Sequence, residues 1–450
     1  MRKIIAPLFA ALLVALAATV PARVEAKEGQ LVRDAEIEDI IRAYTTPLFQ
    51  AAGLSPNDIK VYLIRDSRLN AFVTPGLRMF INTGLLMRAE TPLQVIGVIA
   101  HETGHLAAGH TATRGDALSQ ASATVIASYV LGLGAALLTG HPELAPAIVS
   151  GGQDIALKGL LSYTRSQEST ADQMAVRFLN GTHQSPRGLL EFMKILGGQE
   201  VLYNDNQDPY LRSHPLTQDR IAFLEDQVKK SPYSNKPASP ELVAMHNRMR
   251  AKLYGFLEPL DRVLQVYPET DESLPARYAR AIAHYQAGDI DLGLKLTNAL
   301  IEEMPKDPYF RELKGQMLFE YGRLAEALPE YQEAVRLRPR SPQLRLGLAQ
   351  VEIETNRPDL NGAALENIEA TLRGEPDNSM AWRLAAIAYG RKGDVGMAAL
   401  ALAERALAQG KAKEAKEQAG RAQEILPPGS PGAIRAADIT GLADQLIKNN

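Results

Sequence analysis

The first half of the chain contains three short segments in which apolar and polar residues alternate. These segments are residues 59–64, 70–74 and 77–83, and Pro75 and Gly76 supply a turn between the last two. Alternation with a period of two is typical of a strand with one buried face. The pattern therefore predicts a small β-sheet that contains a tight Pro-Gly connection.

Two other segments have the apolar spacing of helices. Residues 93–100 form a largely apolar run that leads into residues 101–105, and this run predicts a buried helix. Residues 174–179 have apolar side chains at helical spacing and follow the segment 168–172, which contains two acidic residues. Small residues at 169–171 should let this second helix approach the first closely.

The second half of the chain is helical and repetitive. Gly288 and Gly322 are 34 residues apart, and 34 residues is the period of the tetratricopeptide repeat. Stacked helix pairs of this kind form a curved solenoid whose concave face docks peptides or proteins, although a rigid spacer is the alternative. Asn356-Arg357-Pro358 replaces the glycine turn of the third unit and predicts a bend there. The turns within pairs are expected at Gly288, Gly322, Asn356 and Gly393, and the pairs are expected to end at Pro305, Pro339, Pro376 and Gly410.

The amino-terminal residues have the organisation of an export signal. Arg2 and Lys3 precede the uncharged run 4–22, and small residues follow as far as Ala26. We expect a signal peptide cleaved near Ala26, with a membrane anchor as the alternative. A segment rich in proline and serine then divides the rest of the chain. The expected parts are a signal peptide at 1–26, a first folded domain at 27–230, a linker at 231–240 and a repeat domain at 241–450.

The amino-acid composition excludes some classes of function. The 450 residues include no cysteine, which excludes disulfides and thiol chemistry. The formal net charge is −3, and loss of residues 1–26 removes three basic residues and one acidic residue, which makes it −5. This mildly acidic balance argues against nucleic-acid binding. Residues 117–140 carry no charge and predict a buried helix or a mobile hydrophobic flap. Peripheral contact with a membrane surface, or a membrane span, is the alternative for this segment.

An H-E-x-x-H sequence lies within the first predicted helix, at His101, Glu102 and His105. Two imidazoles four residues apart lie on one helix face and can bind one Zn²⁺ ion. The carboxylate of Glu102 can take a proton from a water molecule that attacks a carbonyl. A pair of surface histidines is the alternative, but the apolar run 93–100 places both histidines in the interior. The motif therefore predicts a zinc peptidase.

A catalytic zinc site of this kind needs a third protein ligand. The extended motif with a third histidine is excluded, because Ala108 and Thr111 occupy the positions that it reserves for glycine and histidine. His110 lies one residue before the position that the extended motif reserves for histidine, and it should pack at the helix end. Glu168 on the second helix is the expected ligand, and Asp172 should accept a hydrogen bond from the far nitrogen of a ligating histidine.

Three further groups are candidates for roles near the metal. His214 precedes Pro215 and could stabilise an oxyanion, occupy the open metal position as a plug, or be a surface histidine. Residues 197–213 predict a polar loop before it. Arg220 could pair with substrate, with Glu168 or with a surface acid. The strand that begins at Asn70, Ala71 and Phe72 could bind an extended peptide along its edge.

The combined motifs resemble those of the HtpX-like and CAAX-prenyl-protease-like zinc metallopeptidases. The matching elements are H-E-x-x-H, E-x-x-A-D at 168–172, the stretch 70–76, and His214-Pro215 with Arg220, which occur in the family's order. The turn at Gly76-Leu77 departs slightly from the family pattern. The resemblance implies a gluzincin-type α+β metallopeptidase domain with a small β-sheet, within a mainly α chain that ends in an α-solenoid.

An export signal, such a zinc domain and a repeat array together resemble the periplasmic bacterial proteases that enhance β-barrel assembly. This resemblance implies one Zn²⁺ per chain, a periplasmic location and cleavage of unfolded or stalled outer-membrane proteins. It also implies contact of the repeats with the β-barrel assembly machinery. The alternative is a chaperone or assembly scaffold in which the zinc site is structural or gated.

Overall fold

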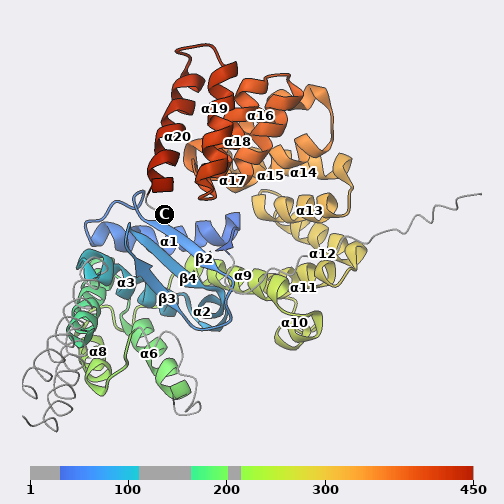
Figure 1. Cartoon of the computed structure of the whole chain (residues 1–450). Coiled ribbons are helices and arrows are strands. Elements are labelled where there is room, and N and C mark those ends of the chain that lie inside the picture. The colour runs from blue at the N-terminus through green and yellow to red at the C-terminus, as the bar shows by residue number, and fades with distance from the viewer. Residues whose placement is uncertain (1–30, 111–163, 201–213, 449–450) are drawn as a thin grey trace, which may run out of the picture.

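The computed structural model describes residues 31–110, 164–200 and 214–448 (Figure 1). The expected signal peptide, the segment 117–140 and residues 201–213 therefore lie outside the described residues. The predicted loop at 197–213 is wrong at its start, because helix α6 (Arg187–Glu200) continues through residues 197–200. Gly197 faces the side chain of Leu216 at close range, so its lack of a side chain serves packing inside the helix.

A four-stranded sheet forms the centre of the first domain. Its strands are β1 (Leu31–Val32), β2 (Lys60–Ile64), β3 (Ala71–Thr74) and β4 (Arg78–Asn82), in the order β1-β2-β4-β3. Strands β2 and β4 are parallel, and β1 and β3 run antiparallel to their neighbours. The three predicted strands are confirmed. Strand β1 was not predicted, because two residues are too few to show an alternating pattern.

Helices cover the sheet and carry the site residues. They are α1 (Ala35–Ala51), α2 (Thr83–Arg88), α3 (Pro92–Ala107), a helix over residues 164–181, α6, and α8 (Gln218–Lys230). Side chains from α1, the sheet and α3, such as Ile41, Ile81 and Val98, form one apolar core. The burial of this core fixes α3, which is buried along nearly its whole length.

Glycines set the distances between these helices. A Cβ atom on Gly97 of α3 would lie 2.6 Å from the backbone nitrogen of Leu189 in α6. A Cβ atom on Gly104 would lie 2.8 Å from the carbonyl oxygen of Ala171. Both distances are too short for a real contact, so α3 approaches its neighbours through backbone atoms. The expected close approach of the helix that contains residues 169–171 is confirmed.

The repeat domain consists of successive helix pairs that arc above the first domain (Figure 1). Each predicted turn within a pair has a residue with positive φ, at Gly288 (95°), Gly322 (72°), Asn356 (54°) and Gly393 (78°). Residues Pro358–Leu360 form a 3-10 turn, which is the predicted departure of the third unit. The pairs are α11 (Leu274–Gln286) with α12 (Ile290–Glu303), α13 (Pro308–Glu320) with α14 (Leu324–Leu337), α15 (Pro342–Glu354) with α16 (Asn361–Gly374), α17 (Ser379–Arg391) with α18 (Val395–Ala408), and α19 (Ala412–Ile425) with α20 (Pro431–Lys448).

Helix α9 (Pro240–Leu257) belongs to both halves of the molecule, and the short α10 (Leu260–Val266) follows it. Helix α9 packs extensively against α11 and also contacts α1, α2 and α3. Its residues Met249 and Leu253 are part of the apolar core of the first domain. His246 Nε2 lies 2.9 Å from the carbonyl oxygen of Ala89, in the connection between α2 and α3. The repeat array is therefore continuous with the packing behind α3, the helix that contains the H-E-x-x-H motif.

Of the first three inter-repeat loops, the loop between α12 and α13 contacts α9, and the loops between α14 and α15 and between α16 and α17 contact the first domain directly. Asp307 in the first loop binds Arg248, which also pairs with Glu36 of α1. Arg338 in the second loop pairs with Asp39 of α1. In the third loop, Glu375 pairs with Arg33 and Asp377 pairs with Lys60. Helix α1 and the neighbouring strands are thus held against three consecutive repeats.

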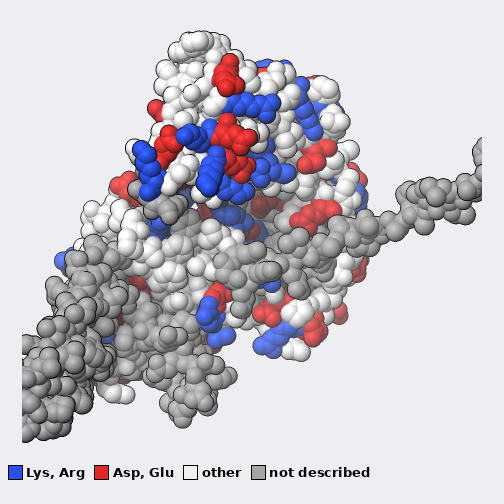
Figure 2. All heavy atoms as spheres, viewed as in Figure 1, with Lys and Arg blue, Asp and Glu red and all other residues white. Residues whose placement is uncertain are grey.

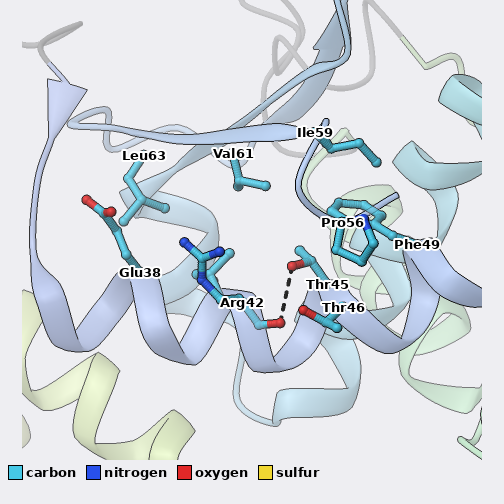
Figure 3. Close-up of a pocket in the computed structure, with 10 residues that line it drawn as sticks. Glu38, Arg42, Thr45, Thr46, Phe49, Pro56, Ile59, Val61 and Leu63 are labelled. Atoms are coloured by element: carbon cyan, nitrogen blue, oxygen red, sulfur yellow. Dashed lines mark hydrogen bonds between the residues drawn. The ribbon is translucent and has the colours of Figure 1, made fainter. Parts of the chain in front are cut away.

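Two hollows lie away from the H-E-x-x-H helix. One of about 60 Å³ lies between α1 and β2 and is lined by residues that include Thr45, Phe49 and Val61 (Figure 3). A larger one of about 420 Å³ lies among α16, α17, α18 and α20 and is lined by Trp382 and Tyr389. Acidic and basic side chains are intermixed over the repeats on the face seen in Figure 2. Among the described helices, none combines the length and the apolar character that a membrane span requires.

Candidate metal centre

Helix α3 presents His101, Glu102 and His105 to the interior. All three side chains are buried, with exposures of 0%, 0% and 6%. The two ring nitrogens that face each other, His101 Nε2 and His105 Nε2, are 3.2 Å apart. The burial follows from the apolar run before the motif, which packs on both sides of the helix. The predicted placement of both histidines in the interior is confirmed.

Glu168 reaches the same point from the helix over residues 164–181. Its Oε2 atom lies 3.2 Å from His101 Nε2, and its Oε1 atom lies 3.3 Å from His105 Nε2. One ligand atom each from His101, His105, Glu168 and His214 all lie within 4.8 Å of one another. The structure therefore brings together the three expected ligands and adds His214 as a fourth potential donor. This group can hold a metal ion.

Asp172 and Arg220 contact the potential ligands on the side away from the proposed metal position. Asp172 Oδ1 lies 2.9 Å from His101 Nδ1, the nitrogen that faces away from the other ligands. Arg220 donates two hydrogen bonds to the Asp172 carboxylate, at 2.7 and 2.9 Å, and its Nη1 lies 2.9 Å from Glu168 Oε2. Of the three partners considered for Arg220, Glu168 lies within ion-pair distance, and Asp172 is a further partner. Both acids are thus fixed in position by one buried guanidinium.

His214 lies inside the group. It is 5% exposed, so the expectation of a surface histidine is wrong. Its Nδ1 atom lies 3.1 Å from Glu168 Oε1 and 3.5 Å from His101 Nε2, and its Nε2 atom lies 3.6 Å from Glu102 Oε1. Arg220 Nη1 donates to the carbonyl oxygen of Pro215 at 3.1 Å, which ties the segment to the site. His214 therefore lies beside both the ligands and Glu102.

Burial and hydrogen bonding move the pKa values of these groups in different directions. Burial lowers the pKa of His105 to about 3, which keeps that imidazole neutral. Burial opposes the charge on His101 too, but hydrogen bonds to Asp172 and Glu168 raise its pKa to about 9. Burial acts to raise the pKa of Glu168, but hydrogen bonds from three histidines lower it. The carboxylate is therefore ionised and available to a cation.

The donor set fits a metal ion with an associated water molecule. Two imidazoles and one carboxylate are ligand types that zinc accepts at catalytic sites. Glu102 is fully buried, and neither of its carboxylate oxygens has a hydrogen-bond partner among the described residues. Burial raises the pKa of Glu102. A buried carboxylate without a hydrogen-bond partner is costly unless a solvent molecule or substrate satisfies it, so this geometry suits a proton acceptor.

Sequence reasoning missed a contact of His110. Helix α3 ends at Ala107, and Gly109 has a φ of 69°, so the chain reverses direction before His110. His110 Nδ1 then lies 2.9 Å from His105 Nδ1. The group of potential metal ligands among the described residues does not include His110. The helical angle between positions 105 and 110 could not predict this contact, because the helix does not continue that far.

Strand β3 lies beside the metal-binding helix. It is the last strand of the sheet as described and packs against α3. Ala71 is buried, and the ring of Phe72 stacks on Phe80 with centroids 5.0 Å apart. The side-chain oxygen of Asn70 is buried and has no hydrogen-bond partner in the described ranges. The three residues proposed to bind peptide thus lie at or beside the edge of the sheet.

Comparison with known proteins supports this assignment. Residues 32–228 match Peptidase family M48, and residues 278–342 and 318–386 match tetratricopeptide repeat families. The Beta-barrel assembly-enhancing protease of Yersinia pestis is 24% identical over 81% of this chain and 74% of its own length. The protein of the same name from Escherichia coli (strain K12) is 23% identical over 79% and 72%.

More distant relatives cover single domains. Mitochondrial metalloendopeptidase OMA1 of Schizosaccharomyces pombe is 26% identical over 41% of this chain and 51% of its own length. The solved tetratricopeptide protein YrrB is 18% identical and matches 47% of this chain and 97% of its own, with a TM-score of 0.29. The metal-ligand geometry and the matched domains agree. The chain carries a Peptidase family M48 domain followed by tetratricopeptide repeats, and it is a metalloendopeptidase.

Proposed function

We propose that this protein is a zinc metalloendopeptidase of the periplasm that cleaves unfolded or misassembled outer-membrane proteins. One observation carries the catalytic part of the proposal. His101, His105 and Glu168 converge from two helices, with potential ligand atoms within 4.8 Å. A single ion can bridge groups at this separation, and two imidazoles with one carboxylate are ligand types that zinc accepts.

The proposed ligands are His101 and His105 through Nε2, and Glu168 through its carboxylate. A zinc ion bound there would lower the pKa of a water molecule and polarise the carbonyl of the bond to be cut. The Asp172 carboxylate lies 2.9 Å from His101 Nδ1, where it favours a proton on that nitrogen and so leaves Nε2 free to bind the ion. Arg220 holds both acids in this geometry.

Glu102 is the proposed general base. Its carboxylate takes a proton from the attacking water molecule and later gives that proton to the leaving amine. Burial raises the pKa of this carboxyl group, which helps it to hold the proton between the two steps. Glu102 projects from the same helix as the two histidine ligands, so its distance from them is set by helix geometry.

The experiment that tests the enzyme assignment is Glu102→Gln in the full chain. We expect the variant to bind one zinc ion per chain and to lose roughly 10²- to 10⁴-fold in cleavage of an unfolded outer-membrane protein. Metal analysis and a gel-based cleavage assay measure the two effects. Glu90→Gln, at an exposed position just before α3, is the matched control and should cleave normally. Unchanged cleavage by Glu102→Gln would exclude Glu102 as the base.

Extended substrate is proposed to bind along β3. The strand has no further neighbour among the described strands, so its outer edge can pair with a peptide backbone. Asn70, Ala71 and Phe72 lie at the start of this edge. Main-chain pairing is tolerant of sequence and needs an extended peptide, which suits clients that have not folded.

The repeats are proposed to dock clients or the β-barrel assembly machinery. The names of the relatives and the docking surface of a tetratricopeptide array support this part, as does the expected signal peptide at 1–26. A second function is favoured by the position of His214, which completes a group of four potential donors. Four protein ligands close a zinc site, so the alternative is an assembly scaffold with a gated or structural ion. Barrel assembly without cleavage of any client would favour it.

A further inference from the structure

The two histidines of the H-E-x-x-H motif have different partners at their outer nitrogens. His101 Nδ1 faces the carboxylate of Asp172 at 2.9 Å. His105 Nδ1 faces another imidazole, that of His110, also at 2.9 Å. The rings of His105 and His110 meet edge to face, with centroids 5.0 Å apart and an angle of 68°. The second pair is the less usual one, because an imidazole can either donate or accept at a given nitrogen.

The proton positions follow from the ligand atom of His105. Its Nε2 atom lies 3.2 Å from His101 Nε2 and 3.3 Å from Glu168 Oε1, so Nε2 is the atom directed at the metal position. A neutral imidazole that binds a metal through Nε2 carries its proton on Nδ1. His105 Nδ1 must therefore donate, and His110 Nδ1 must accept. This requires His110 to carry its own proton on Nε2.

The local chain is shaped to make this contact. Helix α3 stops at Ala107, and Ala108 closes the last turn with its backbone N–H on the carbonyl oxygen of Gly104. Gly109 then adopts a φ of 69°, a backbone conformation that residues other than glycine rarely take. The resulting reversal carries His110 back over the last turn of the helix. A continued helix would place it well around the axis from His105.

From this geometry we propose that His110 is a positioning residue for the metal site. Its Nδ1 atom accepts the Nδ1 proton of His105 and thereby holds the ligand ring in its orientation and tautomer. The inference rests on the proposed role of His105 as a metal ligand. His110 does not touch the metal position, so its effect is on how tightly the ion is held. Asp172 performs the equivalent task for His101 through a carboxylate.

The test compares His110→Phe and His110→Asn in the full chain. Phenylalanine keeps a ring for packing but accepts no hydrogen bond, whereas the asparagine amide oxygen can accept one near the place of Nδ1. We expect the zinc dissociation constant, measured by competition with a chelator, to rise about 10- to 100-fold in the Phe variant. The Asn variant should stay within about threefold of the unchanged protein. The melting temperature of the zinc-free protein should be the same for all three.

Two controls separate the possible failures. His284→Ala removes a half-buried imidazole from α11 and should leave zinc binding unchanged. His105→Ala should lose zinc outright; if it does not, the proposed metal site itself is wrong. If His105→Ala loses zinc while His110→Phe binds it as tightly as the unchanged protein, the positioning role is overturned. Equal weakening in the Phe and Asn variants would also overturn it, because the acceptor would not be the cause.

Discussion

His214 approaches one of the proposed ligands, Glu168, as closely as the proposed ligands approach one another. Its Nδ1 atom lies 3.1 Å from Glu168 Oε1, a distance similar to the 3.2 Å between the ligand nitrogens of His101 and His105. We infer that His214 occupies the place that an attacking water molecule would need, so that it acts as a plug rather than assisting the oxyanion.

We therefore expect His214→Ala to raise the rate of cleavage of an unfolded client by several-fold while zinc content stays unchanged. The physical reason is that alanine opens the fourth position without removing any of the three ligands. Initial rates at equal zinc loading measure the effect. His183→Asn, which changes an exposed histidine remote from the group, is a suitable control. A lower rate in the alanine variant would instead show that His214 assists the reaction.

At the scale of elements, two helices must approach within backbone contact for the ligand set to form. Helix α3 supplies both histidines and the helix over residues 164–181 supplies Glu168, and they meet where Gly104 faces Ala171. Because this approach has no room for a methyl group, the distance between the ligands depends directly on the glycine. The metal site is in this sense a property of the helix pair.

Gly104→Ala should therefore force the helices apart by a few tenths of an ångström or more. We expect a loss of about 1–3 kcal/mol in the free energy of unfolding, together with weaker zinc binding. Urea denaturation and chelator competition measure the two effects. Gly181→Ala is the matched control, because a Cβ atom there meets nothing within 4 Å. Tight zinc binding in Gly104→Ala would mean that the helices can separate without moving the ligands.

Sequence patterns predicted most of the helices and strands of this protein, but they did not predict the contacts between residues that lie far apart in the sequence. Strands, paired helices and the H-E-x-x-H motif depend on local spacing, and Glu168 could be found because the motif lacked one ligand. The contact of His110 could not be found, because it depends on the exact end of α3. The ion pairs between α1 and α9 were also missed, because charge pairs between residues far apart in the sequence leave no periodic signal.

At the scale of the whole molecule, a cluster of charges joins the two domains. Lys252 of α9 is 2% exposed and lies near three carboxylates, those of Asp34 and Glu36 in the first domain and of Glu312 in α13. Glu36 also accepts from the hydroxyl of Tyr278 in α11 at 2.8 Å. One buried ammonium group thus pairs with acids from both domains. The protonation state of the cluster therefore affects the stability of the contact between the domains.

Burial raises the pKa of Glu312 to about 7, and Lys252 only partly offsets this effect. The folded protein therefore binds a proton that the unfolded chain releases above its ordinary pKa of 4.5. This contribution to stability is present below pH 4.5 and is lost as the pH rises to about 7. Glu312→Gln should remove a slope of at most about 1.4 kcal/mol per pH unit in that window.

Chemical denaturation of both proteins at several pH values between 5 and 8 measures the slope. The comparison must be with the unchanged protein, because burial also raises the pKa of Glu352 to about 7. Glu302→Gln, at an exposed position of α12, should keep the original slope. Parallel stability curves for Glu312→Gln and the unchanged protein would show that Glu312 is ionised throughout this range.

The three inter-repeat loops have a mechanical consequence. A free tetratricopeptide array can change its curvature and twist, because each unit contacts only its neighbours. Here the loops after α12, α14 and α16 are anchored on α9, on α1, and on Arg33 and Lys60 next to or in the sheet, so the curvature of the array is restrained. A ligand that needs a different curvature must strain these anchors, and the strain is then transmitted to the domain that holds the metal site.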